Sequence, residues 1–289
     1  MGRIIVGMDV IDNCGLPTPL PLRVQSLASG SSGNAYLIQA GSDVVLVDCG
    51  VGFRHVQAML TECCSSIDEI LGVVITHEHS DHVRSLGSVL RRTTPVLATL
   101  GTADALGLPH DRYTRLRYRD AVSLGSLTVT PIQTSHDAAE PCGLVITVAD
   151  KTIGIITDLG SVTDEITAIA ARCDLLVLES NHDREMLRTG PYPAHLKRRV
   201  ASSNGHLSND QASGMIQEIS TGSGGPTDVW LAHLSATNNT PALARKTAEG
   251  RFRRSGPSPS VTVLPRQETG PVWTGSSVRV RQLELMVDR

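Results

Sequence analysis

Short runs of apolar, mostly β-branched residues recur along this 289-residue chain and limit its fold more than any other feature. Such runs predict strands, several of them buried on both faces. They lie at residues 35–40, 43–48, 70–76, 95–99, 127–134, 144–150, 152–158, 174–180 and 228–235. Helical segments are expected between them, at about 53–63, 82–92, 163–172, 184–190 and 208–219. Because strands outnumber helices and come in two consecutive blocks, the pattern favours an α+β fold of two sheets packed face to face.

Proline and capping residues mark the expected boundaries. The Pro-rich residues 16–22 cannot continue a helix or a central strand, so we expect residues 1–21 to form an N-terminal extension. Residues 22–289 are expected to form a single domain, in which residues 266–289 supply edge strands or a tail. Ser208, with Gln211 three residues later, predicts the start of a helix.

Composition excludes several classes of protein. Hydrophobic residues make up 40% and charged residues 19%, with 26 Lys and Arg against 29 Asp and Glu, which excludes a disordered chain or a basic nucleic-acid coat. No apolar run approaches the roughly 18 to 20 residues that a membrane helix needs, and the first residues do not resemble a secretory leader. We therefore expect a cytoplasmic protein with no membrane partner. Aromatic residues, at 3%, are too few for extended base-stacking platforms.

The strongest chemical signal is the motif HEHSDH at residues 77–82, directly after an apolar strand. In a loop leaving a strand, His77 and His79 can face one centre, while Asp81 and His82 turn to a second. Imidazole and carboxylate suit Zn²⁺, Mn²⁺ or Fe, and the motif contains no Cys, which argues against a closed structural zinc site. The pattern predicts an open, catalytic metal site.

Further ligand types follow later strands, with His136 after residues 127–134, Asp158 after 152–157 and His233 after 228–232. One catalytic metal takes about three protein ligands and a water, and a pair of metals takes a bridging carboxylate. The number of candidates fits two divalent ions. We expect the first ion to be held by His77, His79 and His136, the second by Asp81, His82 and His233, with Asp158 between them.

These residues resemble the metallo-β-lactamase fold, including its Asp-containing turn in LVDCG at residues 46–50. Four segments resemble the WalJ/YycJ-like group of DNA exonucleases: SGSSGNAYLI at 29–38, THEHSDHVRSLG at 76–87, LESNHDREML at 178–187 and SNGHLSNDQA at 203–212. The likeness covers about residues 23–265. It implies a four-layer αββα sandwich, a dinuclear Zn²⁺ or Mn²⁺ site and phosphodiester cleavage from a 5′ end.

Two segments are candidates for binding substrate phosphates. The Gly/Ser loop at residues 29–34 could form an anion nest through Ser31, Ser32 and Asn34, or it could be only a tight hairpin turn. Residues 182–206 carry an excess of basic side chains and could form a lid over the site or a solvated helix and loop. The basic candidates in this segment are Arg184, Lys197 and Arg198.

The expected activity is phosphodiester hydrolysis by a hydroxide between two metals, with Asp81 and Asp158 orienting it. His182 or His206 would protonate the leaving oxygen or bind the scissile phosphate, although either could be a core or capping histidine. His206 could also exchange roles with His233. The expected partner is nucleic acid, with DNA favoured; the oligomeric state stays open, with a homodimer as one option. The alternatives are a small-molecule metallo-hydrolase acting on a thioester, lactam or cyclic phosphodiester, and a non-catalytic metal-binding regulator.

Overall fold

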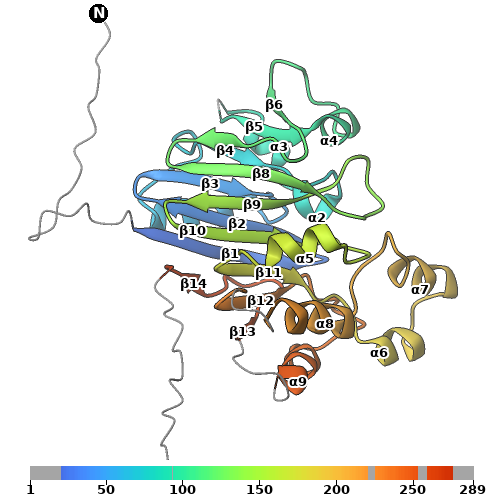
Figure 1. Ribbon diagram of the computed structural model, residues 1–289. Helices are drawn as coiled ribbons and strands as arrows, with labels where there is room; N and C mark the ends of the chain where they lie inside the picture. The colour runs from blue at the N-terminus through green and yellow to red at the C-terminus, as the bar shows by residue number, and fades with distance from the viewer. Residues whose placement is uncertain (1–20, 93, 221–224, 253–258, 276–289) are drawn as a thin grey trace, which may run out of the picture.

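The computed structural model describes residues 21–92, 94–220, 225–252 and 259–275. In this part of the chain, two seven-stranded sheets stack face to face (Figure 1). The first has the strand order β14-β1-β2-β3-β4-β5-β6, and the second has the order β13-β12-β11-β10-β9-β8-β7. The expected α+β sandwich is confirmed.

The first sheet begins with an antiparallel hairpin, and it becomes parallel from β3 onward because helical crossovers connect the later strands. Its strands are β1 Leu22–Gly30, β2 Gly33–Ala40, β3 Asp43–Val47, β4 Gly72–Val74, β5 Val96–Thr99, β6 Tyr113–Leu116 and β14 Val272–Trp273. β14 pairs antiparallel with β1 at one edge.

The second sheet has the same mixed character. Strands β7 to β10 are antiparallel, and β10 to β13 are parallel. Its strands are β7 Val122–Leu124, β8 Leu127–Gln133, β9 Cys142–Val148, β10 Lys151–Ile156, β11 Leu175–Glu179, β12 Asp228–Ala232 and β13 Ser260–Val263. Because β8 and β10 are both antiparallel to β9, the strands β8, β10, β11 and β12 all end at the same edge of the sheet. That edge carries the site.

Helices cover the outer face of each sheet. Side chains of α1, α3 and α4 pack with Leu37 and Leu46 of the first sheet, and those of α5, α8 and α9 pack with Leu178 and Val229 of the second. A separate core, including Tyr36 and Ile146, fills the space between the sheets. The helices are α1 Phe53–Glu62, α2 Ser80–Val83, α3 Leu86–Val89, α4 Leu100–Ala105, α5 Asp164–Ala170, α6 Arg184–Thr189, α7 Ala194–Val200, α8 Asn209–Ser220 and α9 Pro241–Phe252.

The structure departs locally from the sequence-based expectation. Residues 82–92 were expected to form one helix, but they contain the end of α2 and then α3, because the Ser85 hydroxyl donates to the carbonyls of Cys49 and Val51 and holds a break there. The capping box at α8 is confirmed: the Gln211 N–H donates to Ser208 Oγ, and the Ser208 N–H donates to Gln211 Oε1.

The two ends of the chain are only partly covered. The expected extension at residues 1–20 and the last alternating stretch, 276–289, lie outside the described residues. Before that stretch, β13 lies at an edge of the second sheet and β14 at an edge of the first. None of the helices in the described ranges has the length and apolar character needed to cross a membrane.

Candidate metal centre

The candidate ligands meet at the edge where the strands end. His136 follows β8, Asp158 follows β10 and His233 follows β12, while His77 follows β4 of the other sheet. Two of these residues have left-handed backbone conformations, with φ 55° at Asp158 and φ 54° at His233. Such conformations are uncommon for residues other than glycine, and they gather at functional sites, where the surrounding fold holds them in place.

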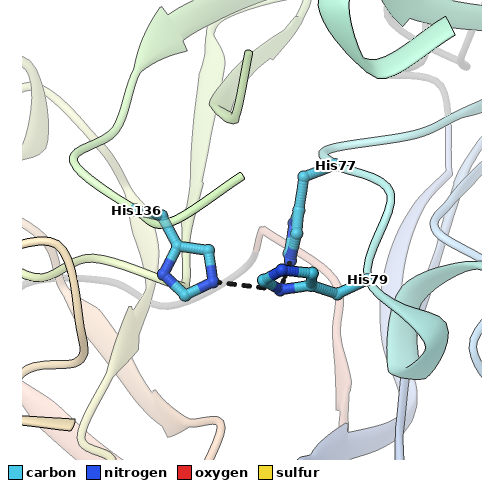
Figure 2. Close-up of side chains that lie close together, drawn as sticks. All are labelled: His77, His79 and His136. Atoms are coloured by element: carbon cyan, nitrogen blue, oxygen red, sulfur yellow. Dashed lines mark hydrogen bonds between the residues drawn. The ribbon is translucent and has the colours of Figure 1, made fainter. Parts of the chain in front are cut away.

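One group of imidazoles consists of His77, His79 and His136 (Figure 2). Nδ1 of His79 lies 3.1 Å from Nε2 of His77 and 3.2 Å from Nε2 of His136. Three ring nitrogens therefore converge on one point from two different sheets. This arrangement matches the three protein ligands of an open catalytic site.

A second group consists of Asp81, His82 and His233. Oδ2 of Asp81 lies 3.7 Å from Nε2 of His82 and 3.4 Å from Nε2 of His233. As in the first group, one ligand comes from the second sheet and the others come from the motif after β4. The structure thus brings the seven sequence-predicted ligands into one cluster.

Asp158 lies between the two groups. Its Oδ2 is 3.3 Å from Nε2 of His82, and its Oδ1 is 3.7 Å from Nε2 of His136. Oδ2 is also buried and makes no hydrogen bond to any described residue. A buried carboxylate oxygen without a donor is costly unless a cation neutralises it. The donor set and this oxygen fit divalent metal ions.

Asp48 fixes the orientation of His82. Its Oδ2 accepts a 2.7 Å hydrogen bond from Nδ1 of His82, which leaves Nε2 facing the cluster. The hydroxyl of Thr76 also donates to Asp48, and the backbone at Asp48 is left-handed, with φ 57°. Carboxylates behind a ligating imidazole set its tautomer and its basicity. In the sequence, this turn is indicated only by the resemblance of residues 46–50 to the metallo-β-lactamase fold.

Glu179 orients two histidines in the way that Asp48 orients His82, and it was not among the residues predicted from the sequence. Its Oε1 accepts 2.8 Å hydrogen bonds from Nδ1 of His206 and from Nδ1 of His233, and its Oε2 accepts from the N–H groups of Leu159 and Leu207. Burial raises the pKa of Glu179, but the two imidazoles outweigh it and lower the pKa to about 2. The signal available in the sequence was a carboxylate at the end of an apolar run, the run that forms β11.

The imidazoles of the cluster differ in their preferred charge. Burial lowers the pKa of His77 well below its usual value and also lowers that of His136, so both are neutral, the form that binds metal. Burial alone would lower the pKa of His82, but the carboxylates of Asp48 and Asp158 raise it to about 10. An imidazole among carboxylates holds a proton that a metal ion would replace.

A pocket of about 390 Å³ opens over the cluster. Part of its lining is made of candidate ligands and of the neighbouring His206, and another part comes from α7 and Tyr192 before it. The pocket is lined by Ser31, His79, Ser80, Asp81, Asp158, Asn181, Tyr192, Leu196, Arg199, Val200, His206, His233, Ser235 and Asn238.

The predicted phosphate-binding loop is a two-residue hairpin between β1 and β2, the alternative that the sequence left open. Ser31 lines the pocket, but Ser32 faces Gln267. Asn34 is fully buried behind the cluster, where its Nδ2 lies 3.0 Å from Nε2 of His82. Asn34 therefore supports a ligand and has no free surface for a phosphate.

The predicted basic contacts lie mostly outside the pocket. Arg184 contacts Ser208 and Asp210, the Lys197 ammonium donates to the Arg188 carbonyl, and Arg198 is exposed. Arg199, a further basic side chain of this segment, lines the pocket and forms an ion pair with Asp137. The segment therefore brings a basic residue to the pocket through Arg199.

The two candidate proton donors differ in position. His206 lines the pocket, and its ring lies 5.2 Å from that of His233. His182 is buried, belongs to none of the ligand groups of the described residues, and has an Nδ1 without a hydrogen-bond partner there. Burial lowers the pKa of His182 to about 4, so its ring is neutral, and the residue is not among those that line the pocket.

A His/Asp cluster at the strand ends of two stacked sheets defines a metal-dependent hydrolase of the metallo-β-lactamase fold. Residues 44–233 match the family described as "Beta-lactamase superfamily domain", and the chain belongs to this superfamily. Over 241 residues, the chain is 34% identical to the exodeoxyribonuclease YycJ of Bacillus anthracis. The aligned region covers 81% of this chain and 90% of the relative. The resemblance to the WalJ/YycJ-like group is confirmed.

Two further comparisons agree. The chain is 31% identical over 230 residues to the exodeoxyribonuclease WalJ of Streptococcus pneumoniae, covering 76% of this chain and 84% of the relative. Among solved structures, the metallo-β-lactamase fold protein YhfI from Bacillus subtilis superposes with a TM-score of 0.68 at 20% identity, covering 88% of this chain and 99% of that one. The last comparison concerns the fold alone.

Proposed function

We propose that this protein is a dinuclear metal-dependent phosphodiesterase that degrades DNA from the 5′ end. The observation that carries the proposal is the position of Asp158 between two His/Asp groups at the base of one open pocket. The similarity to proteins named exodeoxyribonuclease supports DNA as substrate, and the sequence resemblance to the WalJ/YycJ-like group supports the 5′ direction.

The seven clustered residues would hold two ions, either Zn²⁺ or Mn²⁺, because imidazole and carboxylate ligands accept both. Bound there, the ions would supply a hydroxide at neutral pH and stabilise charge on the phosphate. Each group takes ligands from both sheets, so we infer that the two sheets act as one catalytic unit. No second domain is needed to complete the site.

The protein residues position the reacting groups. Asp81 and Asp158 would orient the attacking water toward phosphorus. As the new P–O bond forms, the bond from phosphorus to the 3′ oxygen breaks, and that oxygen takes up a proton. His206 lies in the pocket and is fixed by Glu179, so we assign it this proton transfer in preference to His182. Ser31 and Arg199, which line the pocket, would hold phosphate oxygens.

A gel assay tests the proposal. Metal-depleted protein is added to duplex and single-stranded DNA and RNA labelled at one end, with Mn²⁺, Zn²⁺ or Mg²⁺ restored, and an Asp81→Ala, His82→Ala double variant serves as control. We expect metal-dependent loss of DNA from the 5′ end that the double variant lacks. Turnover of a thioester or a cyclic phosphodiester with no cleavage of any polymer would overturn the proposal, as would metal binding without turnover of any substrate.

A further inference from the structure

The residues that α7 and its preceding link contribute to the pocket differ in chemistry from the candidate ligands that line it. Leu196, Arg199 and Val200 are three and four residues apart, so they share one face of α7, and that face lines the pocket. Tyr192, just before α7, lines it as well. The cluster residues therefore suit a phosphate, whereas α7 and the residue before it offer an aromatic ring and aliphatic side chains beside Arg199. A ligand that satisfies both has an anionic end and a flat, weakly polar end.

Tyr192 is held in place by its neighbours. It lies between Pro191 and Pro193 in the link from α6 to α7, where the rings of both prolines restrict the backbone. Its hydroxyl makes no hydrogen bond within the described part of the chain, and the residue is half-buried. The backbone that carries the ring is therefore restricted, and the ring keeps an exposed surface at the pocket.

The segment that carries Tyr192 is itself tied down. Figure 1 shows α6 and α7 standing outside the two sheets. The Lys197 ammonium donates to the Arg188 carbonyl, which joins α7 to α6, and Arg199 pairs with Asp137 beside His136. The carbonyl of Gly205, just after α7, accepts a hydrogen bond from Nδ1 of His136. These contacts connect the segment that carries Tyr192 to α6 and to the residues beside the cluster.

We infer that the ring of Tyr192 stacks on the base of the 5′-terminal nucleotide while the next phosphate lies at the cluster. This inference rests on the proposed function and specifies its substrate. A pocket of about 390 Å³ is at the small end of ligand sites and takes one nucleotide, not a base pair, so the terminal base enters unpaired. Because stacking tolerates any base, the site selects an unpaired end with little preference for sequence.

The test compares two 5′-phosphorylated single-stranded oligodeoxynucleotides that differ only in the first residue, which is thymidine in one and an abasic tetrahydrofuran nucleotide in the other. The proteins are the wild type, Tyr192→Ala, the ring-preserving Tyr192→Phe, and His195→Ala on the exposed face of α7 as matched control. The wild type should cleave the abasic end with a kcat/KM about tenfold lower, the size of one lost stacking contact. Tyr192→Ala should lose the same factor on thymidine, mainly through KM, and little on the abasic end, whereas the other two variants should behave like the wild type.

A binding measurement separates stacking from a general role of Tyr192 in folding. With 2-aminopurine as the first base, the catalytically impaired Asp81→Ala protein should quench its fluorescence, and the Asp81→Ala, Tyr192→Ala protein should not. Equal cleavage of both ends by the wild type, or equal losses on both in Tyr192→Ala, would overturn this inference while the exonuclease stands. Failure of the wild type to cleave either end would overturn the proposed function and this inference with it.

Discussion

Oδ2 of Asp48 lies 2.7 Å from Nδ1 of His82, and neither side chain has contact with solvent. The two residues are 34 positions apart, and they meet because β3 and β4 are parallel neighbours whose carboxyl ends lie side by side. The contact turns Nε2 of His82 toward Asp81 and Asp158, where it would bind a metal in place of its contact with Asn34. Asp48 thus acts on the site through His82, without being a ligand itself.

Replacing this carboxylate should weaken metal binding. In Asp48→Asn, the amide keeps its shape but loses the charge that fixes the tautomer of His82, so we expect the affinity for metal to fall about 10- to 100-fold. Competition with a chromogenic chelator measures the change. Asp68→Asn, which alters an exposed pair with Arg92, is the matched control. Equal affinity in both variants would contradict this role for Asp48.

The two candidate proton donors, His182 and His206, should differ in their effect on rate. His206→Ala should lower kcat about 10²- to 10⁴-fold on DNA, the usual loss for a general acid. His182→Ala should leave kcat nearly unchanged, because that ring is outside the pocket. Hydrolysis of bis-p-nitrophenyl phosphate provides the internal check. Because its leaving group departs without a proton, the rate on this substrate should not change when His206 is lost. An equal loss of rate on DNA and on this substrate would point to damaged metal binding instead.

Metal removal should destabilise the whole sandwich. The group His77, His79 and His136 and the group Asp81, His82 and His233 both join the two sheets, and an ion at a hundredfold excess over its Kd stabilises the folded chain by about 2.7 kcal/mol. We therefore expect a chelator to lower Tm by about 5 °C or more in a thermal unfolding scan. The Asp81→Ala, His82→Ala variant should show a smaller shift. An unchanged Tm in protein shown by elemental analysis to be metal-free would argue against ions that bridge the sheets.

The loop after Asp158 should tolerate no added methyl group. A Cβ on Gly160 would lie 2.3 Å from the Ser203 carbonyl oxygen, which belongs to the loop leading into His206. We expect Gly160→Ala to lower the free energy of unfolding by about 1–3 kcal/mol and to reduce activity by displacing that loop. In Gly87→Ala the new methyl group would point into open space, so the change should stay within about 1 kcal/mol. Urea unfolding compares the two variants.

The sequence by itself determined the parts of this protein that depend on local pattern. Runs of β-branched residues predict strands because the pattern of apolar residues at neighbouring positions shows which of them are buried. The structure confirms the two-sheet sandwich. The motif at residues 77–82 brings its ligand types together within a single loop. His136, Asp158 and His233 could be selected because each follows an apolar run, and strand ends are where such sites form.

Only the tertiary structure decided the roles that depend on which strands become neighbours. Glu179 ends a strand like many others, and it contacts His233, 54 residues away, because β11 and β12 are paired in the sheet. Asn34 looked like a phosphate contact in its loop, but the fold buries it against His82. Tyr192 lines the pocket because the tertiary fold brings it there together with residues of α7. Periodicity encodes which residues are buried, whereas long-range pairing decides what lies next to them.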